Sequence, residues 1–211
     1  MPAAVRRWLL SHALGYDLDR SSRIHAFVVL DASEVHLGPN AAIGPFTVCR
    51  NLERLFLAEA ATIGKFNWIT GVRRGETPHY VWQKHRKSTL ELHEHAAITH
   101  RHIIDCTDAI SIGAFSIVAG YRSQFLTHGI DIERARQTAA PITVGRYCFI
   151  GTNCVLLAGS SLPDCCVLGA KSLLNKRFEE SYRLYGGVPA SPIKALPTDA
   201  AYFSRKTGFV T

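Results

Sequence analysis

The aliphatic residues of segment 142–173 recur at every sixth position. Within ITVGRYCFIGTNCVLLAGSSLPDCCVLGAKSL they are Val144, Ile150, Leu156, Leu162 and Leu168. Helices repeat every 3.6 residues and strands every two, so neither explains this period. The repeating unit is therefore larger, and the chain returns to an equivalent position after each group of six residues.

The fifth residue of each group, counted from the aliphatic one, is always small. A large and a small residue per group suit a triangular prism in which each group forms one face. Three groups then make one coil, and coils stack about 4.8 Å apart. We predict that cysteines at this position are compact core residues, and since C-x-x-C spacing is absent we expect no disulfides. The small residues are Cys148, Cys154, Ser160, Cys166 and Ser172.

The same pattern occurs in the N-terminal part of the chain, as LGPNAAIGPFTV at 37–48 and IGKFNW at 63–68. A further run shifts its phase by two residues, which indicates an interruption of the coil. This run contains Ile98, Ile104 and Ile110, followed after the shift by Ile112 and Val118.

The repeat gives an all-β fold class, a parallel β-helix, and divides the chain into a body with two extensions. Segments outside the pattern are where loops leave a rigid coil, and such loops are common positions for functional sites. The predicted divisions are an N-terminal extension at 1–22, the coil at 23–175 with loops near 71–91 and 129–141, and a C-terminal cap and tail at 176–211.

Composition limits the classes of ligand and partner. The chain has 211 residues, 47% of them hydrophobic, which is enough for one compact domain. Its net charge of +7 suits an anionic ligand. Basic residues do not alternate with aromatic ones, so we expect no nucleic acid. No apolar run approaches the ~20 residues that span a bilayer. We expect a soluble, cytoplasmic protein in which RRWLLSHAL at 6–14 forms a short helix that packs on the body or contacts a membrane peripherally.

Four motifs in the second half of the chain resemble one known family. They are FLTHGID, PITVGRYCFIGTNCVLLAG, VLGAKSLLNK and GGVPASPIK. Segment 98–196 as a whole is similar to the left-handed β-helix, hexapeptide-repeat acetyltransferases, especially the maltose and galactoside O-acetyltransferases. The resemblance implies a left-handed parallel β-helix, a homotrimer, and acetyl-CoA as co-substrate in a cleft between neighbouring prisms.

The resemblance assigns the catalytic base to His128, in FLTHGID. The chemistry of acetyl transfer independently requires such a group. An acceptor hydroxyl has a pKa far above neutrality and needs a base as it attacks the thioester carbonyl, and an imidazole titrates close to the working pH. We therefore predict His128 as the general base.

The resemblance also implies contacts with the cofactor and the acceptor. Backbone N–H groups at Ala158 and Gly159 are candidates for holding the thioester oxygen or the pantetheine amide. His100 and His102 lie where related sugar acetyltransferases often carry an acceptor-binding asparagine, which suggests a different acceptor here. The positions that match cofactor contacts of the family are Thr152, Ala170, Asn175, Lys176 and Lys194.

The sequence favours an acetyl-CoA-dependent O-acetyltransferase that acts on a sugar or glycan precursor, in polysaccharide biosynthesis, by direct transfer in a ternary complex without a metal. N-acetylation of an amino sugar is a second interpretation. A third is a zinc protein like the γ-class carbonic anhydrases, since alternation along a strand would pair His93 with His95 and His100 with His102. A non-catalytic trimeric scaffold is a fourth.

Overall fold

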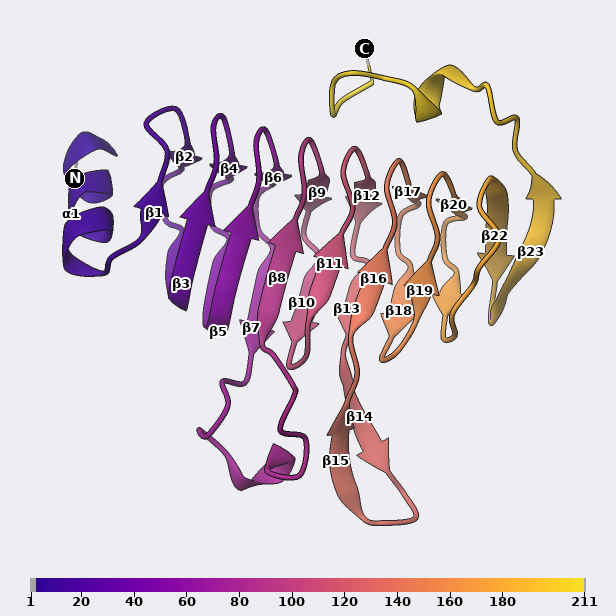
Figure 1. The fold of residues 1–211 in the computed structure, drawn as a ribbon, viewed down its shortest axis with the longest axis horizontal. Coiled ribbons are helices and arrows are strands. Elements are labelled where there is room, and N and C mark those ends of the chain that lie inside the picture. The colour runs from indigo at the N-terminus through magenta and orange to yellow at the C-terminus, as the bar shows by residue number, and fades with distance from the viewer. Residues whose placement is uncertain (1–2, 211) are drawn as a thin grey trace.

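The computed structural model describes residues 3–210, and its fold is a left-handed parallel β-helix (Figure 1). Strands of successive coils pair in parallel and form the three faces of a prism. Helix α1 (Ala3–Ala13) lies at the N-terminal end of the prism. Residues 1, 2 and 211, which belong to the predicted extension and tail, lie outside the described residues.

The first face begins with the N-terminal halves of the two long strands β3 (Val29–Leu37) and β5 (Val48–Leu57), which continue around a corner into the second face. The strands β7 (Trp68–Gly71), β10 (Ile103–Cys106), β13 (Gln124–Leu126), β18 (Val155–Leu157) and β21 (Leu173–Leu174) complete the first face.

The second face contains the C-terminal halves of β3 and β5. It also contains β1 (Asp17–Leu18), β8 (Thr89–Leu92), β11 (Ile110–Ile112), β16 (Ile142–Val144) and β19 (Ser161–Leu162).

The third face is a separate sheet. It consists of β2 (Arg23–Ile24), β4 (Ala42–Ile43), β6 (Thr62–Ile63), β9 (Ala97–His100), β12 (Ile117–Tyr121), β17 (Phe149–Ile150), β20 (Val167–Leu168), β22 (Arg183–Gly187) and β23 (Ala190–Ala195). Strand pairing begins with β1 and ends with β23, so it extends beyond the predicted coil limits of 23 and 175 at both ends.

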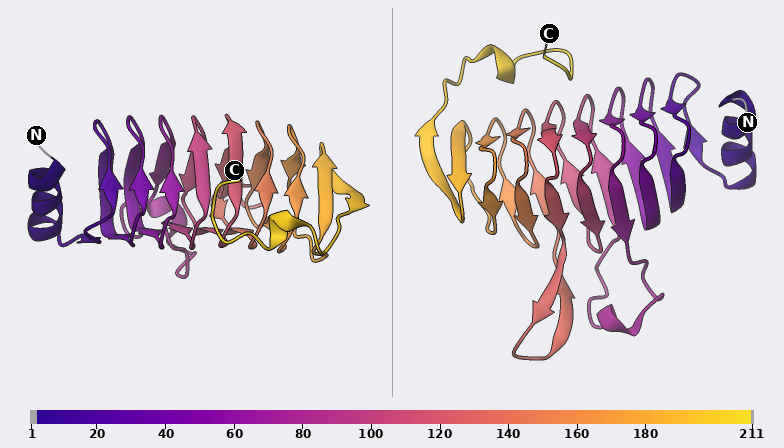
Figure 2. Two further views of the ribbon diagram at one scale, coloured as in Figure 1. Left: turned by 90° about the horizontal axis from the view of Figure 1, so that it is seen from above. Right: turned by 180° about the vertical axis from the view of Figure 1, so that it is seen from behind.

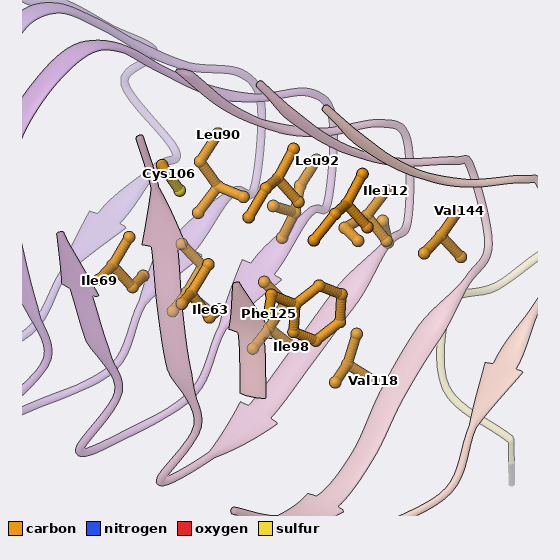
Figure 3. Packing of buried hydrophobic residues seen from close by; sticks show 14 of the residues in the cluster. Ile63, Ile69, Leu90, Leu92, Ile98, Cys106, Ile112, Val118, Phe125 and Val144 are labelled. Carbon is orange, nitrogen blue, oxygen red and sulfur yellow. The ribbon is translucent and has the colours of Figure 1, made fainter. Parts of the chain in front are cut away.

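The six-residue period arises from three faces that each point one aliphatic residue inward (Figure 3). Val144 pairs with Leu162 and Ile150 with Leu168, so one coil spans three groups of six, as predicted. The phase shift near residue 110 arises on the second face, where the neighbouring strands β8, β11 and β16 each bury two alternate residues. Ile110 and Ile112 are both buried in β11 while Ser111 between them is more exposed, so this strand points two residues inward.

The small residue of each group is also buried, directly after the corner of the prism. The residue before it has a positive φ, for example 53° at Tyr147, 58° at Asn153 and 59° at Lys171. This left-handed conformation is unfavourable for side chains other than glycine, and the packing of the coils offsets its cost. Burial raises the pKa of Cys166 to about 11, so this thiol is protonated at neutral pH.

Two excursions leave the prism at the corner between the first and second faces (Figure 1). One is the loop 72–88, which contains the 3-10 helix η1 (Pro78–Tyr80). The other is the antiparallel hairpin of β14 (His128–Asp131) and β15 (Arg136–Ala139). Both project from this corner of the prism and lie next to each other.

The C-terminal tail folds back over the prism (Figure 2) and contains the 3-10 helix η2 (Ala201–Phe203). The Tyr202 hydroxyl donates to the Cys148 carbonyl at 3.3 Å, and the Tyr147 hydroxyl donates to the Arg205 carbonyl at 3.2 Å. These bonds fasten the tail to the corner between the second and third faces. Among the described residues, no helix has both the length and the apolar character needed to cross a membrane.

Candidate active site

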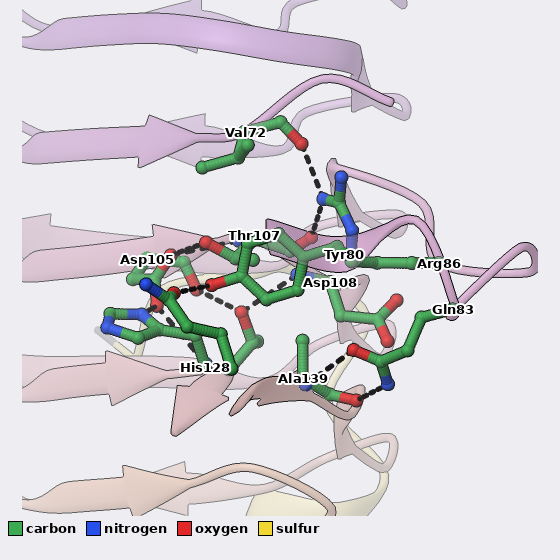
Figure 4. A network of polar contacts seen from close by, with 11 residues as sticks. Val72, Tyr80, Gln83, Arg86, Asp105, Thr107, Asp108, His128 and Ala139 are labelled. Carbon is green, nitrogen blue, oxygen red and sulfur yellow. Dashed lines mark hydrogen bonds and ion pairs between the residues drawn. The ribbon is translucent and has the colours of Figure 1, made fainter. Parts of the chain in front are cut away.

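His128 lies where β14 leaves the coil, and its ring is bonded to a carboxylate (Figure 4). Its Nδ1 contacts Oδ2 of Asp105. Since an ionised carboxylate can only accept hydrogen bonds, Nδ1 carries the proton and Nε2 has a free lone pair. The His128 side chain is 49% exposed, whereas that of Asp105 is 12% exposed. The pair thus presents a basic nitrogen to solvent from a buried anionic support.

The carboxylate of Asp105 is held by further donors. Its Oδ1 accepts from the backbone N–H of Thr107 at 2.9 Å and from the Thr107 hydroxyl at 2.7 Å. Its Oδ2 also accepts from the backbone N–H of His128 at 3.3 Å. The Thr127 hydroxyl donates to the Asp105 carbonyl at 2.8 Å. These contacts fix the orientation of the carboxylate and, through it, the imidazole.

Asp105 is absent from the residues that the sequence indicated. It lies on β10, one coil before His128, and pairs in register with Leu126 of β13. The signal in the sequence that could have identified Asp105 is the register between coils, which places its carboxylate on the strand next to FLTH at 125–128. The two-residue phase shift at Ile110 and Ile112 lies between β10 and β13 and conceals this register in the sequence.

The loop 72–88 is bonded to the hairpin beside the Asp105–His128 pair. The Gln83 side chain donates to the Ala139 carbonyl at 2.7 Å and accepts from the Ala139 N–H at 2.9 Å. The Tyr80 hydroxyl donates to Oε1 of Gln137 at 2.6 Å. Burial raises the pKa of Tyr80, and the charge of Asp105 contributes to the same effect. The two excursions therefore form one connected wall next to His128.

Four of the residues predicted to bind the cofactor lie on the corner from which His128 projects. The N–H of Gly159 donates to the Pro141 carbonyl, at the base of the hairpin, at 3.1 Å. This bond occupies the N–H group of Gly159, which therefore cannot hold a thioester oxygen as proposed from the sequence. The exposed Asn175 and Lys176 lie one coil further on, where the Lys176 carbonyl accepts from Ser161 N–H at 3.3 Å. Ala158 precedes Gly159 in the same turn.

The other predicted cofactor residues lie elsewhere in the chain. Thr152 is on the corner between the third and first faces, where its hydroxyl accepts from Tyr121 N–H at 3.0 Å. Ala170 lies in the next turn of that corner, so close that a Cβ on Gly151 would be 2.6 Å from the Ala170 nitrogen. Lys194 is exposed on β23 at the C-terminal end of the prism. In a single chain, the residues predicted to bind the cofactor therefore lie on two corners of the prism and at its C-terminal end.

The prediction that His102 contacts an acceptor is wrong, because its side chain is completely buried. Its Nδ1 accepts from Ser123 N–H at 3.1 Å, and its Nε2 lies 3.0 Å from the Thr99 hydroxyl. Burial lowers the pKa of His102 to about 4, so it is a neutral core residue. His100 is partly exposed on the corner that carries Thr152, and its Nδ1 accepts from Lys65 N–H at 3.1 Å.

The expected pairing of histidines on strand faces is also wrong. His95 and Arg101 have positive φ values, 56° and 59°, and each lies in a corner of the prism. The corner at Arg101 separates His100 from His102, and His95 lies in the corner that follows His93. The alternation of a straight strand therefore does not apply. Within residues 3–210, no three His, Cys, Asp or Glu side chains gather in an arrangement that could hold a metal ion.

Comparison with known proteins gives no matching family model and no matching curated protein. Solved structures do match. The polysialic acid O-acetyltransferase OatWY is 17% identical, with a TM-score of 0.63 and 90% of each chain covered. The hexapeptide-repeat acetyltransferase VCA0836 of Vibrio cholerae O1 biovar eltor, solved with acetyl-CoA, is 18% identical, with a TM-score of 0.53 over 93% of this chain and 79% of that one.

A third match is a mutant of AntD, an N-acyltransferase from Bacillus cereus, solved with dTDP-4-amino-4,6-dideoxyglucose and coenzyme A. It is 12% identical, with a TM-score of 0.53 over 94% of this chain and 92% of that one. At these identities the likeness establishes the fold. The chain has the left-handed β-helix architecture found in hexapeptide-repeat acyltransferases.

Proposed function

We propose that this protein is an acetyl-CoA-dependent O-acetyltransferase of a sugar or glycan precursor. The observation that carries the proposal is the Asp105–His128 pair, where a buried carboxylate orients an exposed imidazole at the base of the hairpin. Known acetyltransferases share the fold, which supports the class of reaction.

The pair suits direct transfer between a bound thioester and a hydroxyl. Nε2 of His128 takes the proton of the acceptor hydroxyl as its oxygen bonds to the acetyl carbonyl carbon. The C–S bond then breaks, and the imidazolium returns the proton to the departing thiolate sulfur. Asp105 stabilises the imidazolium while it exists and keeps Nδ1 protonated throughout.

The chain also offers groups that suit the coenzyme. Lys176 and Lys194 are exposed cations that can meet phosphates, and Asn175 next to Lys176 is exposed as well. Lys176 lies one coil beyond Ala158, on the corner of the prism from which His128 projects. Thr152 and Ala170 are on a different corner, so a cleft that uses all of these residues requires two copies of the chain.

An exposed apolar stripe on the first face supports a homotrimer with such clefts. Val29, Val48, Trp68 and Ile103 are in register on successive strands, and three of them are about half exposed, at 46% for Val29, 53% for Trp68 and 47% for Ile103. Along the adjacent corner, three phenyl rings stack with centroids 5.0 Å apart. An apolar stripe of this length favours burial against another chain. The stacked rings belong to Phe27, Phe46 and Phe66.

We expect wild-type protein to be a trimer and Ile103→Asp to be a monomer of about 23.3 kDa, because a charge in the centre of the stripe opposes its burial. Light scattering measures the mass. The variant should also lose acetyl transfer, since its clefts are incomplete. Val210→Asp, an equal change at an exposed tail residue, should leave the trimer intact. A monomeric wild type with full activity would contradict the intersubunit cleft.

The proposed activity is tested by incubating the protein with acetyl-CoA and a panel of sugars, measuring released thiol and determining product masses. We expect acceptor-dependent thiol release and a product that carries one acetyl group on oxygen. Protein freed of metal by a chelator should be equally active, because the proposed steps use only His128 and Asp105. Acetylation of an amine would favour the second interpretation. Activity restored only by zinc would favour the zinc protein, and failure to bind coenzyme A would favour a scaffold.

A further inference from the structure

A positively charged pocket lies between the loop 72–88 and residues 108, 109 and 141 of the prism. It has a volume of about 430 Å³, within the range of small-molecule sites, and it is open to solvent on the side of Lys84, His85 and Lys87. Trp82 forms another part of its lining. The proposed reaction uses none of these side chains.

The cations of this pocket lack the partners that neighbouring cations have. Arg73 pairs with Asp31, and Arg74 pairs with Glu53 at 2.8 Å. In contrast, Lys84, Arg86 and Lys87 form no ion pair with any carboxylate of the described residues. The positive charge of this segment is therefore not neutralised by an ion pair within the part of the chain that the structure describes.

The charge of Arg86 is poorly screened by solvent, because this residue is only 3% exposed. Its guanidinium donates to the carbonyls of Val72 and Thr107, while its buried Nε has no partner (Figure 4). A buried cation without a counterion is costly, and its field acts strongly on the adjacent pocket. An anion bound in this pocket would offset that cost.

The described lining contains one carboxylate, that of Asp108, against the three cations of Lys84, Arg86 and Lys87. Oδ1 of Asp108 accepts from the N–H groups of Lys87 at 3.2 Å and Ala109 at 2.8 Å. Asp108 therefore braces the segment that carries the lysines. The segment is also fixed by the double hydrogen bond between Gln83 and Ala139 and by the bond from Trp82 Nε1 to the Gln137 carbonyl at 3.2 Å. The cations are presented from a rigid frame.

We propose that this pocket binds an anionic group of the acceptor, so that the acceptor is an acidic saccharide or a nucleotide-linked sugar. The inference deepens the proposed function and rests on it. The pocket is close to the reacting groups, since Asp108 N–H donates to the Thr127 hydroxyl at 2.9 Å and Thr127 directly precedes His128. Trp82 is 39% exposed with Arg136 over one ring face, which leaves aromatic surface for a sugar or base.

The test is calorimetric binding to the full chain without acetyl-CoA, with trigalacturonic acid, UDP-glucose and neutral maltotriose as probes. We expect one of the two anionic probes to bind more tightly than maltotriose, and the identity of that probe separates a carboxylate from a diphosphate. The double variant Lys84→Gln/Lys87→Gln should weaken its binding by about tenfold, and added salt should weaken it in wild type. Lys65→Gln/Lys206→Gln, which removes the same charge from exposed positions outside the pocket, should bind as wild type does.

Two results would overturn the inference: neither anionic probe binds better than maltotriose, or the Lys84/Lys87 variant binds as tightly as wild type. Activity separates this inference from the proposed function. If acetyl transfer occurs but the variant leaves the KM of acidic acceptors unchanged, the pocket is not an acceptor site and the function stands. If anion binding is lost in the variant but no acceptor is acetylated by wild type, the pocket stands and the function fails.

Discussion

Replacing His128 with alanine is expected to lower kcat by about 10²–10⁴, which corresponds to about 3–5 kcal/mol of transition-state stabilisation. The variant lacks the nitrogen that removes the hydroxyl proton. The side chain is 49% exposed, so its removal creates no cavity in the core. The melting temperature, trimer mass and affinity for acetyl-CoA should therefore remain close to wild type.

The measurement is thiol release with saturating acceptor, together with calorimetry of coenzyme binding. A kcat within about threefold of wild type would remove His128 from the mechanism. Equal losses of rate and coenzyme affinity would instead make it a binding residue. His100→Ala is the matched control, since His100 is a partly exposed histidine on a different corner, and as an acceptor contact it should mainly raise the acceptor KM.

Asp105→Asn is expected to lower kcat by about 10²–10³ with little change in the acceptor KM. In wild type, both carboxylate oxygens accept from N–H or O–H donors of Thr107 and His128. An asparagine amide must place its NH2 group against one of these donors. If the NH2 group faces Nδ1, the ring adopts the other tautomer, and Nε2 carries a proton and cannot act as a base.

The control is Asp31→Asn, because the Asp31 carboxylate also contacts a nitrogen of another side chain, that of Arg73, but has no contact with His128. It should retain its kcat. The separate values of kcat and of the acceptor KM distinguish positioning from a structural defect, since a misplaced ring lowers kcat while acceptor binding stays close to wild type. A variant with wild-type kcat would show that Asp105 is a structural residue.

The fold was predictable because its physical requirements are repeated in the sequence. Each strand must point an aliphatic residue such as Ile150 or Leu168 into the prism, and each corner must be followed by a small residue such as Cys154. The departure of the chain from the coil near His128 was predictable as well, because the residues that follow it do not fit the pattern. The role of His128 as the base comes from the resemblance of FLTHGID to a known family and stays a prediction.

Asp105 and His102 show why the rest of the site was not predictable. The contact between Asp105 and His128 depends on the register between β10 and β13, and the two-residue phase shift at Ile110 and Ile112 lies between these strands. The burial of His102 depends on the corner at Arg101, where a positive φ turns the following residue inward. The contact and the burial both follow from how coils stack and turn. Neither can be predicted from the alternation of residues within a single strand.

The position of the excursions has a consequence for the evolution of the molecule. The coil resumes its register after each of them, with Leu90 of β8 paired to Leu55 and Ile110, and Ile142 of β16 paired to Ile110. The length and composition of the excursions are therefore independent of the stacking that stabilises the prism. Such an architecture is modular: mutation or loop grafting can change the excursions, which contact the acceptor in the proposed function, while the structure of the prism stays the same.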